Sequence, residues 1–225
     1  MAILTDYSKE WSRLYKAEAK RIKKAFGLSC TATYHIGATA IKNMPARPEI
    51  DLLVVLTEKA DLRNLADLGY TYAQDGTYTL HTDGMDYTVR LTKRKPQLHV
   101  DTIHGAATIE SYLAYVMYLS ENKDAAETFA EKKREIADQH ENDLDAYKAA
   151  KKQLIEEIAP AALQYKRQRD KASAYLPIGM CIGMCIGMCF GVAMDNIPIG
   201  MCVGMSVGMC MGLVLGRVSD KPDKK

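Results

Sequence analysis

The spacing of apolar residues predicts a mixed α/β domain over the first three-quarters of the chain. Apolar residues recur at helical spacing over residues 8–26, and Gly27 follows as a helix stop. Two β-prone runs come next, residues 31–36 and 50–56. Further along, the pattern predicts a helix over residues 58–68, strands over 70–74, 78–81, 85–92 and 97–102, and helices over 109–119, 124–139 and 143–168, the last kinked at Pro160.

A glycine turn and a pair of acids are the first sign of chemistry. Gly37 ends the first β-prone run, where the backbone has to turn tightly or approach a ligand closely. Glu49 and Asp51 stand two apart at the start of the second run, so their carboxylates point to the same face of a strand. Paired acids hold Mg²⁺ in two-metal phosphoryl or nucleotidyl transfer. Taken alone, such a pair is more typical of a solvated strand end.

Two later strands add polar residues that could share this face. In residues 85–92 the apolar side chains lie on one face, while Asp86 and Arg90 take the other. In residues 97–102 the same alternation groups His99 with Asp101. If these strands lie beside the Asp51 strand, one face of the sheet gathers acids that could bind a metal, and a base and a cation that could bind phosphate. Asp101 is preferred over Asp86 as the third acid. The alternative is a solvent-facing side of the sheet.

Several segments resemble the GrpB-like family. Residues 35–40 read His-Ile-Gly-Ala-Thr-Ala, and Arg-Pro and Ile-Asp follow at residues 47–48 and 50–51. The family usually reads His-Ile-Gly-Ser-Thr-Ala-Val-Pro-Gly, then Lys-Pro, then Ile-Asp. Weaker matches continue at Leu98, His99 and Val100, at Phe129 with Lys133, and at Tyr147 with Lys151, so that the resemblance covers roughly residues 7–157.

This resemblance implies the nucleotidyltransferase-superfamily fold, a small mixed sheet with packed helices, in which Gly-Ser and Asp-x-Asp mark the active site. The chain departs from that pattern, because Ala38 replaces the serine and Lys42-Asn43 replaces the usual Pro-Gly. Glu49 stands where many members are apolar. The residues expected to bind a nucleotide are His35, Gly37, Ala38, Thr39, Arg90, Lys133 and Lys151.

Composition separates residues 1–170 from residues 171–225. Eight of twelve Met, five of six Cys and nine of fifteen Gly follow Leu176. Only four of the 30 Lys and Arg and three of the 28 Asp and Glu follow Leu176, which leaves 26 basic against 25 acidic residues in residues 1–176. This near-neutral balance gives no reason to expect a nucleic-acid partner.

The tail predicts a membrane hairpin over residues 177–216. Glycine recurs at every fourth position in two arms, and Asp195 is the only charge between Lys171 and Arg217. Repeated GxxxG in apolar segments is typical of helices that pack backbone to backbone in a bilayer. Each 17-residue arm gives about 25 Å of helix. The tail resembles bacterial glycine-zipper hairpins, whose GxxxG faces would also serve a homo-oligomer.

Five tail cysteines are predicted to fill the zipper groove, and a soft-metal site is the alternative. Residues 1–6 lack the features of a signal peptide, and basic residues flank the hairpin on both sides. The domain and both termini are therefore predicted at the cytoplasmic side of the cell membrane.

Together these features favour a membrane-tethered enzyme that moves a nucleotidyl group from a Mg²⁺-bound nucleoside triphosphate to a small acceptor. Glu49, Asp51 and Asp101 would hold the metal, while His99 or Arg90 would orient phosphate or acceptor. The alternative is a catalytically inactive nucleotide-binding or scaffold module that the glycine zipper oligomerises.

Overall fold

The computed structural model describes residues 4–74, 76–82, 85–94, 103–141 and 143–218. The chain forms two compact units, Met1–Leu163 and Gln164–Lys225, and each is described by itself. Helix α5 (Leu144–Ala193) begins in the first unit and ends in the second. The predicted strand at residues 97–102 lies outside the described residues, as do His99 and Asp101.

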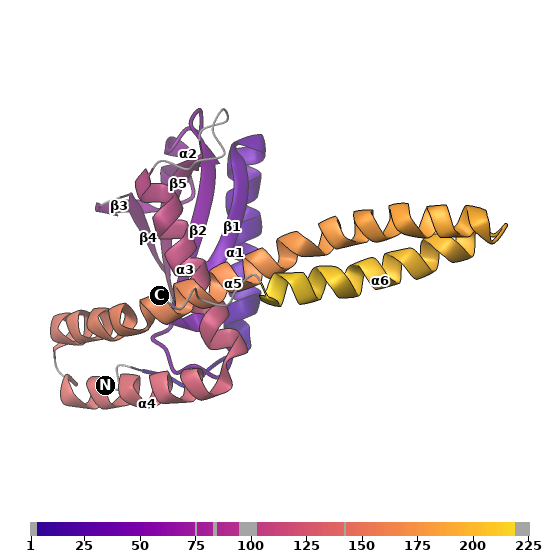
Figure 1. The fold of residues 1–225 in the computed structure, drawn as a ribbon. Coiled ribbons are helices and arrows are strands. Elements are labelled where there is room, and N and C mark those ends of the chain that lie inside the picture. The colour runs from indigo at the N-terminus through magenta and orange to yellow at the C-terminus, as the bar shows by residue number, and fades with distance from the viewer. Residues whose placement is uncertain (1–3, 75, 83–84, 95–102, 142, 219–225) are drawn as a thin grey trace. The chain divides into compact units, whose positions relative to one another are not determined.

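The first unit is a mixed α/β domain, as predicted (Figure 1). Its five strands follow the order β1-β2-β5-β4-β3, in which β2 and β5 are parallel and the other neighbours antiparallel. The elements are α1 (Glu10–Phe26), β1 (Cys30–Ile36), β2 (Glu49–Thr57), α2 (Arg63–Asp67), β3 (Thr71–Gln74), β4 (Thr77–Thr82), β5 (Met85–Arg94), α3 (Ile103–Glu121), α4 (Lys123–Gln139) and the first part of α5.

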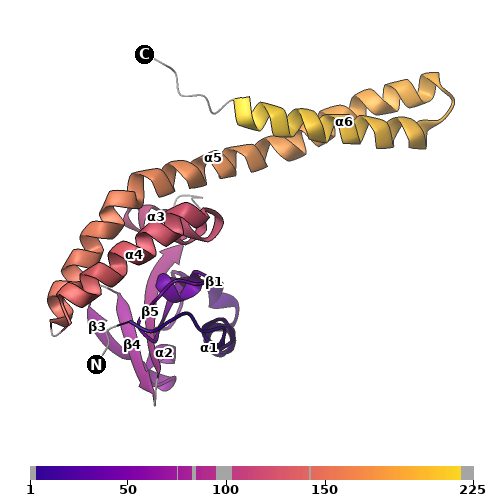
Figure 2. The same ribbon diagram turned by 90° about the horizontal axis from the view of Figure 1, so that it is seen from below.

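Strand β2 is apolar on both faces because helices cover the sheet on both sides (Figure 2). Ile50 and Leu52 join Trp11 of α1 in the main core cluster. Leu53 and Val55, on the other face, are buried as well. The polar residues Glu49 and Asp51 share the face of Leu53. Arg90 of β5, which pairs with Leu53, contacts Tyr112 of α3 on this face.

Three helices differ from their predicted extents. Helix α3 begins at Ile103, six residues before the predicted start at residue 109. The helix predicted over residues 58–68 is reduced to α2, because the chain first makes a turn in which Ala60 N–H donates to Thr57 O. Helix α5 does not end at residue 168 but continues through the helix-forming residues that follow and into the tail. The α-helix continues without a break through Pro160.

Glu18 interrupts the apolar stripe of α1, yet it is buried. Its Oε1 accepts hydrogen bonds from Tyr70 Oη at 2.8 Å and from Arg21 Nε at 3.1 Å. Burial and the Glu18 carboxylate raise the pKa of Tyr70. The carboxylate thus keeps the partners that a buried charge requires.

The second unit is a helical hairpin made by the end of α5 and by α6 (Ile197–Val218) (Figure 1). Asp195, with φ 50°, lies in the turn. A Cβ added at Gly183 or Gly187 would lie 2.7 Å or 2.8 Å from the Cα of a glycine on α6 and would overlap a backbone oxygen there. The glycine faces therefore pack against each other backbone to backbone. Both helices are long and apolar enough to cross a membrane.

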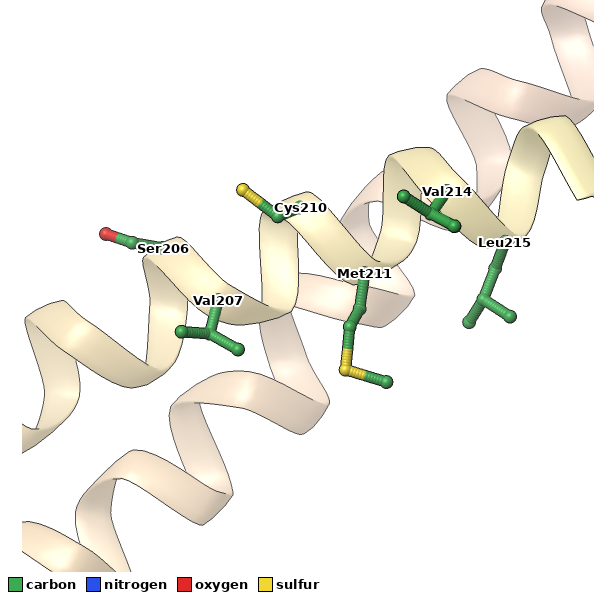
Figure 3. Close-up of a pocket in the computed structure, with 6 residues that line it drawn as sticks. All are labelled: Ser206, Val207, Cys210, Met211, Val214 and Leu215. Carbon is green, nitrogen blue, oxygen red and sulfur yellow. The ribbon is translucent and has the colours of Figure 1, made fainter.

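The cysteines of the hairpin do not fill this groove, so that prediction was wrong. Cys181, Cys185, Cys189, Cys202 and Cys210 are all exposed. Each lies two residues after a glycine, which places it about 200° around the helix from the packed face. Figure 3 shows Ser206 and Cys210 on one side of α6 and Val207 and Met211 on another. Together with Val214 and Leu215 they line a hollow of about 450 Å³.

Replacing Gly183, Gly187, Gly204 and Gly208 by Leu should separate the two arms while the tail still enters membranes, because hydrophobicity rises as close approach is lost. Spin labels at positions 174 and 213, in a background without native cysteines, would report the separation as a longer and broader distance distribution. The matched control places four leucines at the exposed positions Ile182, Ile186, Val203 and Val207. An unchanged distance in the glycine variant would show that the glycines do not form the interface.

Candidate functional site

A small cavity of about 20 Å³ in the first unit is lined by acidic and basic side chains. It has room for about one water-sized group. The β1–β2 connection, β2, α4 and α5 all contribute side chains. The lining residues are Ala38, Thr39, Ala46, Arg47, Glu49, Asp51, Lys133, Tyr147 and Lys151.

Gly37 sets the position of the turn beside this cavity. Its backbone adopts φ 75° and ψ −172°, a region that is essentially restricted to glycine. An added Cβ would overlap Asp51 Oδ2 and lie 3.1 Å from Asp51 Cγ. The chain then enters a short 3₁₀ turn, Ala38–Ala40. The absence of a side chain at Gly37 therefore lets the turn close directly over the acid.

Asp51 is the most perturbed carboxyl of the cavity. Its pKa is raised to about 6, first because burial disfavours the charged form and second because Glu49 is close. Lys151, Arg90 and Arg47 act in the opposite direction and lower this pKa. Asp51 therefore stands in a field of nearby cations that only partly offsets its burial.

Lys133 reaches the cavity from α4 and is only 1% exposed. Its Nζ donates to the carbonyl oxygen of Pro45 at 2.5 Å, which ties α4 to the β1–β2 connection. Burial and the nearby Lys151 lower the pKa of Lys133 to about 7, while Asp51 opposes that shift. A further anion in the cavity would favour the ammonium form.

Glu49 is held by partners on three sides. Thr88 Oγ1 donates to Glu49 Oε1 at 2.7 Å, and Arg47 Nη2 lies 3.4 Å from Glu49 Oε2. The backbone oxygen of Glu49 accepts from Thr39 Oγ1 at 3.0 Å. The side chain is thereby fixed on the same face of β2 as Asp51, as the sequence predicts.

His35 lies on the opposite face of the sheet. It pairs with Leu52 across β1 and β2, and its ring stacks on Tyr15 of α1 at a centroid distance of 4.6 Å. Its Nε2 lies 3.1 Å from Thr39 Oγ1. Burial lowers the pKa of His35 to about 4, so the ring is neutral at neutral pH. His35 thus reaches the cavity only through Thr39 and does not line it.

Arg90 shares the sheet face of Asp51 but is engaged elsewhere. Its Nη1 lies 3.5 Å from Thr77 Oγ1, and its guanidinium sits 5.6 Å from the ring centre of Tyr112 on α3. Its Nε is buried without a hydrogen-bond partner among the described residues, as is the hydroxyl of Tyr115. Burial, Tyr147 and Asp51 raise the pKa of Tyr115. These groups border Asp51 without lining the cavity.

The charged side chains around the cavity fit a Mg²⁺ ion that is bound to phosphate groups. Mg²⁺ is usually held by one or two carboxylates together with substrate phosphates. Glu49 and Asp51 supply two carboxylates, and Lys133, Lys151 and Arg47 supply charge for phosphate. Among the residues whose side chains are described, no three His, Cys, Asp or Glu residues gather as a metal site. The third acid expected from the sequence, Asp101, is outside those residues.

Four polar residues at or beside the cavity were not predicted as site residues: Arg47, Thr88, Tyr115 and Tyr147. Arg47 and Tyr147 already carried the family resemblance, which was the available signal. The roles of Thr88 and Tyr115 depend on strand register and on helix α3, and no local pattern reports either.

The first unit thus combines a mixed five-stranded sheet with an acid pair and a glycine turn. The family profile described as GrpB protein matches residues 2–160, and the chain belongs to this family. A second profile, described as glycine zipper membrane protein, matches residues 170–218. Both matches confirm the resemblances stated from the sequence.

The relatives agree with this assignment. A UPF0157 protein of Halalkalibacterium halodurans is 27% identical over 174 residues, which cover 71% of this chain and 81% of that protein. The glutamate-rich protein GrpB of Alkalihalophilus pseudofirmus is also 27% identical, over 69% of this chain and 92% of its own. The crystal structure of the conserved protein GrpB from Enterococcus faecalis matches with a TM-score of 0.60 at 25% identity, covering 73% of this chain and 99% of that one.

Gly37→Ala should destabilise the first unit by about 1 to 3 kcal/mol more than Gly27→Ala does. Both glycines have positive φ, but nothing lies within 4 Å of a Cβ at Gly27, so the control carries backbone strain without the clash on Asp51. Urea unfolding of the full chain, followed through the buried Trp11, measures the difference. Equal losses in the two variants would contradict the tight approach of Gly37 to Asp51.

The stability of the wild type should rise relative to Lys133→Met between pH 7 and about 10, by roughly 1 to 3 kcal/mol. In this window the unfolded chain, with an ordinary lysine pKa, binds one proton more than the folded chain, so the free energy of unfolding increases with pH. Lys132→Met is the control, because Lys132 is exposed. Parallel pH profiles for wild type and Lys133→Met would contradict the lowered pKa of the buried Lys133 amino group.

Proposed function

We propose that this chain is a membrane-tethered, Mg²⁺-dependent nucleotidyltransferase acting on a small acceptor. The observation that carries the proposal is the convergence of two carboxylates and three cationic side chains on one cavity. Carboxylates suit a hard cation, while lysine and arginine suit phosphate. Each kind of charge alone would be costly to bury, and a metal-bound triphosphate satisfies both.

In this proposal Lys133 and Lys151 bind phosphate oxygens, and Arg47 continues to orient Glu49. Glu49 and Asp51 hold the metal, with Asp101 as third acid. When bound, Mg²⁺ would neutralise phosphate charge and orient the triphosphate for attack. His35 and Thr39 keep the turn after Gly37 in place, and Arg90 or His99 orients phosphate or acceptor.

A second candidate is a nucleotide-binding scaffold without catalysis. Ala38 favours it, since the turn lacks the hydroxyl that the family pattern offers to phosphate. Turnover of a nucleoside triphosphate distinguishes the two, as the scaffold would bind without releasing product.

The hairpin is proposed to place the first unit at the cytoplasmic face of the cell membrane. Basic residues stand before the first arm and after the second, and the turn carries only Asp195, so the positive-inside rule puts both termini in the cytoplasm. The glycine faces pack within one chain. A homo-oligomer would therefore need either exchange of arms or the outer faces of the helices.

Asp51→Asn should remove Mg²⁺-dependent binding of a nonhydrolysable nucleoside triphosphate, because a neutral amide no longer attracts a hard cation away from its hydration shell. The loss should be at least roughly tenfold in affinity, about 1.4 kcal/mol. Calorimetric titration of the full chain with and without Mg²⁺ measures it. Asp67→Asn is the control, since Asp67 is exposed and lies outside the cavity. If wild type and Asp51→Asn bind equally, or neither binds while both remain folded, the enzyme proposal fails.

Ala38→Ser should strengthen triphosphate binding by about 0.5 to 1.5 kcal/mol, the net value of one added hydrogen bond. Ala38 lines the cavity, so an added hydroxyl would face the bound phosphates. The same titration measures the gain, and Ala40→Ser serves as the control because Ala40 is outside the cavity lining. Weaker binding in Ala38→Ser would mean that the turn after Gly37 does not contact phosphate.

A further inference from the structure

Helix α1 presents a row of lysines on its outward face. Its 17 residues include six basic and two acidic residues. Lys16, Lys20, Lys23 and Lys24 recur at helical spacing, and all four are exposed. Within the described part of the chain, none of the four forms a hydrogen bond or an ion pair. The row is therefore a continuous cationic surface.

Both acids of α1 are already occupied. Glu10 is paired with Arg13 on the exposed surface. Glu18 points into the core, where Tyr70 and Arg21 hold it. Neither acid neutralises the lysine row, although the first part of the chain as a whole is close to neutral. The acids of α1 therefore leave the charge of the four lysines on this face unpaired.

A fully exposed leucine follows this row. Helix α1 ends at Phe26 and is followed by Gly27, with φ 52°. The short turn Gly27–Ser29 presents Leu28 at the surface with an exposure of 101%. Nothing lies within 4 Å of a Cβ at Gly27, so the turn stands clear of its surroundings. A large apolar side chain so exposed, at the end of a lysine row, combines the two features that hold peripheral segments on lipid bilayers.

We propose that this lysine face and Leu28 dock on the anionic lipid headgroups of the membrane that holds the hairpin. Each lysine close to an anionic surface strengthens attraction by roughly fivefold, and Leu28 would enter the acyl boundary. The proposal rests on the membrane association of the hairpin and on the cytoplasmic side proposed above, where anionic lipids are found. It is independent of the chemistry in the cavity.

The observations favour lipid over nucleic acid. Proteins that bind nucleic acid combine basic side chains with exposed aromatic rings for stacking or with side chains that read bases. The aromatic residues of α1 do not lie on the lysine face, because Trp11 and Phe26 are buried and Tyr15 stacks on His35. The exposed apolar residue that follows this row in the chain is Leu28, and a leucine side chain suits acyl chains.

The test uses the full chain with Leu28→Trp, reconstituted into vesicles whose lipids carry brominated acyl chains. Trp11 is 3% exposed and provides a constant internal signal that also reports the folded state. Fluorescence of the added indole should be quenched several-fold more in vesicles with roughly a third phosphatidylglycerol than in pure phosphatidylcholine. Raised salt should remove this difference because it screens surface charge.

Replacing Lys16, Lys20, Lys23 and Lys24 by Gln in the same background should abolish the quenching by anionic vesicles. The matched control, Gln at the exposed Lys59, Lys123, Lys148 and Lys152, makes the same change in net charge and should retain it. Equal quenching in neutral and anionic vesicles, no quenching in either, or loss in both variants would overturn the proposal. A spectral response to added RNA or DNA in place of anionic vesicles would overturn it in favour of a nucleic-acid surface. Sedimentation with the vesicles reports hairpin insertion separately.

Discussion

The approach of the Gly37 backbone to the Asp51 carboxylate is the constraint on which the candidate site depends. Any side chain at residue 37 would occupy the space of the acid. The same turn places Thr39 where its hydroxyl bonds to the backbone of Glu49 and to His35 on the far face of the sheet. The close approach of the Gly37 backbone to Asp51 therefore fixes the turn and the positions of Glu49 and Asp51 on β2. It also fixes the link through His35 to α1.

The charged side chains of the cavity come from elements that lie far apart in the chain. Asp51 comes from the inner strand β2 of the sheet, whereas Lys133 and Lys151 come from α4 and α5, more than eighty residues later in the chain. Burial disfavours the charged forms of both Asp51 and Lys133. Asp51 partly offsets the shift in the pKa of Lys133, while Lys151, Arg90 and Arg47 partly offset the shift in the pKa of Asp51. The hairpin uses glycine for a related purpose, since its missing side chains let two helix backbones meet.

Local patterns predict most elements and the pairing of Glu49 with Asp51 on one face, because strand alternation is a local property. They do not predict the location of His35 on the α1 side, or the hydrogen bond between Lys133 and Pro45, which depend on register and on helix packing. Glu18 breaks the apolar pattern of α1 because its partner Tyr70 is distant in the chain. The exposure of the tail cysteines follows from the four-residue spacing of the glycines, once the glycine face is known to be the packed face.

The central claim is that Asp51 is buried within a cluster of cations. Its most direct test is the pKa of Asp51, measured by NMR of the side-chain carboxyl carbon in the full chain in detergent micelles. The account predicts a pKa of about 6 in the wild type and a higher pKa in Lys151→Met, because the cation that lowers it is removed. An ordinary carboxyl pKa, unchanged by Lys151→Met, would contradict it.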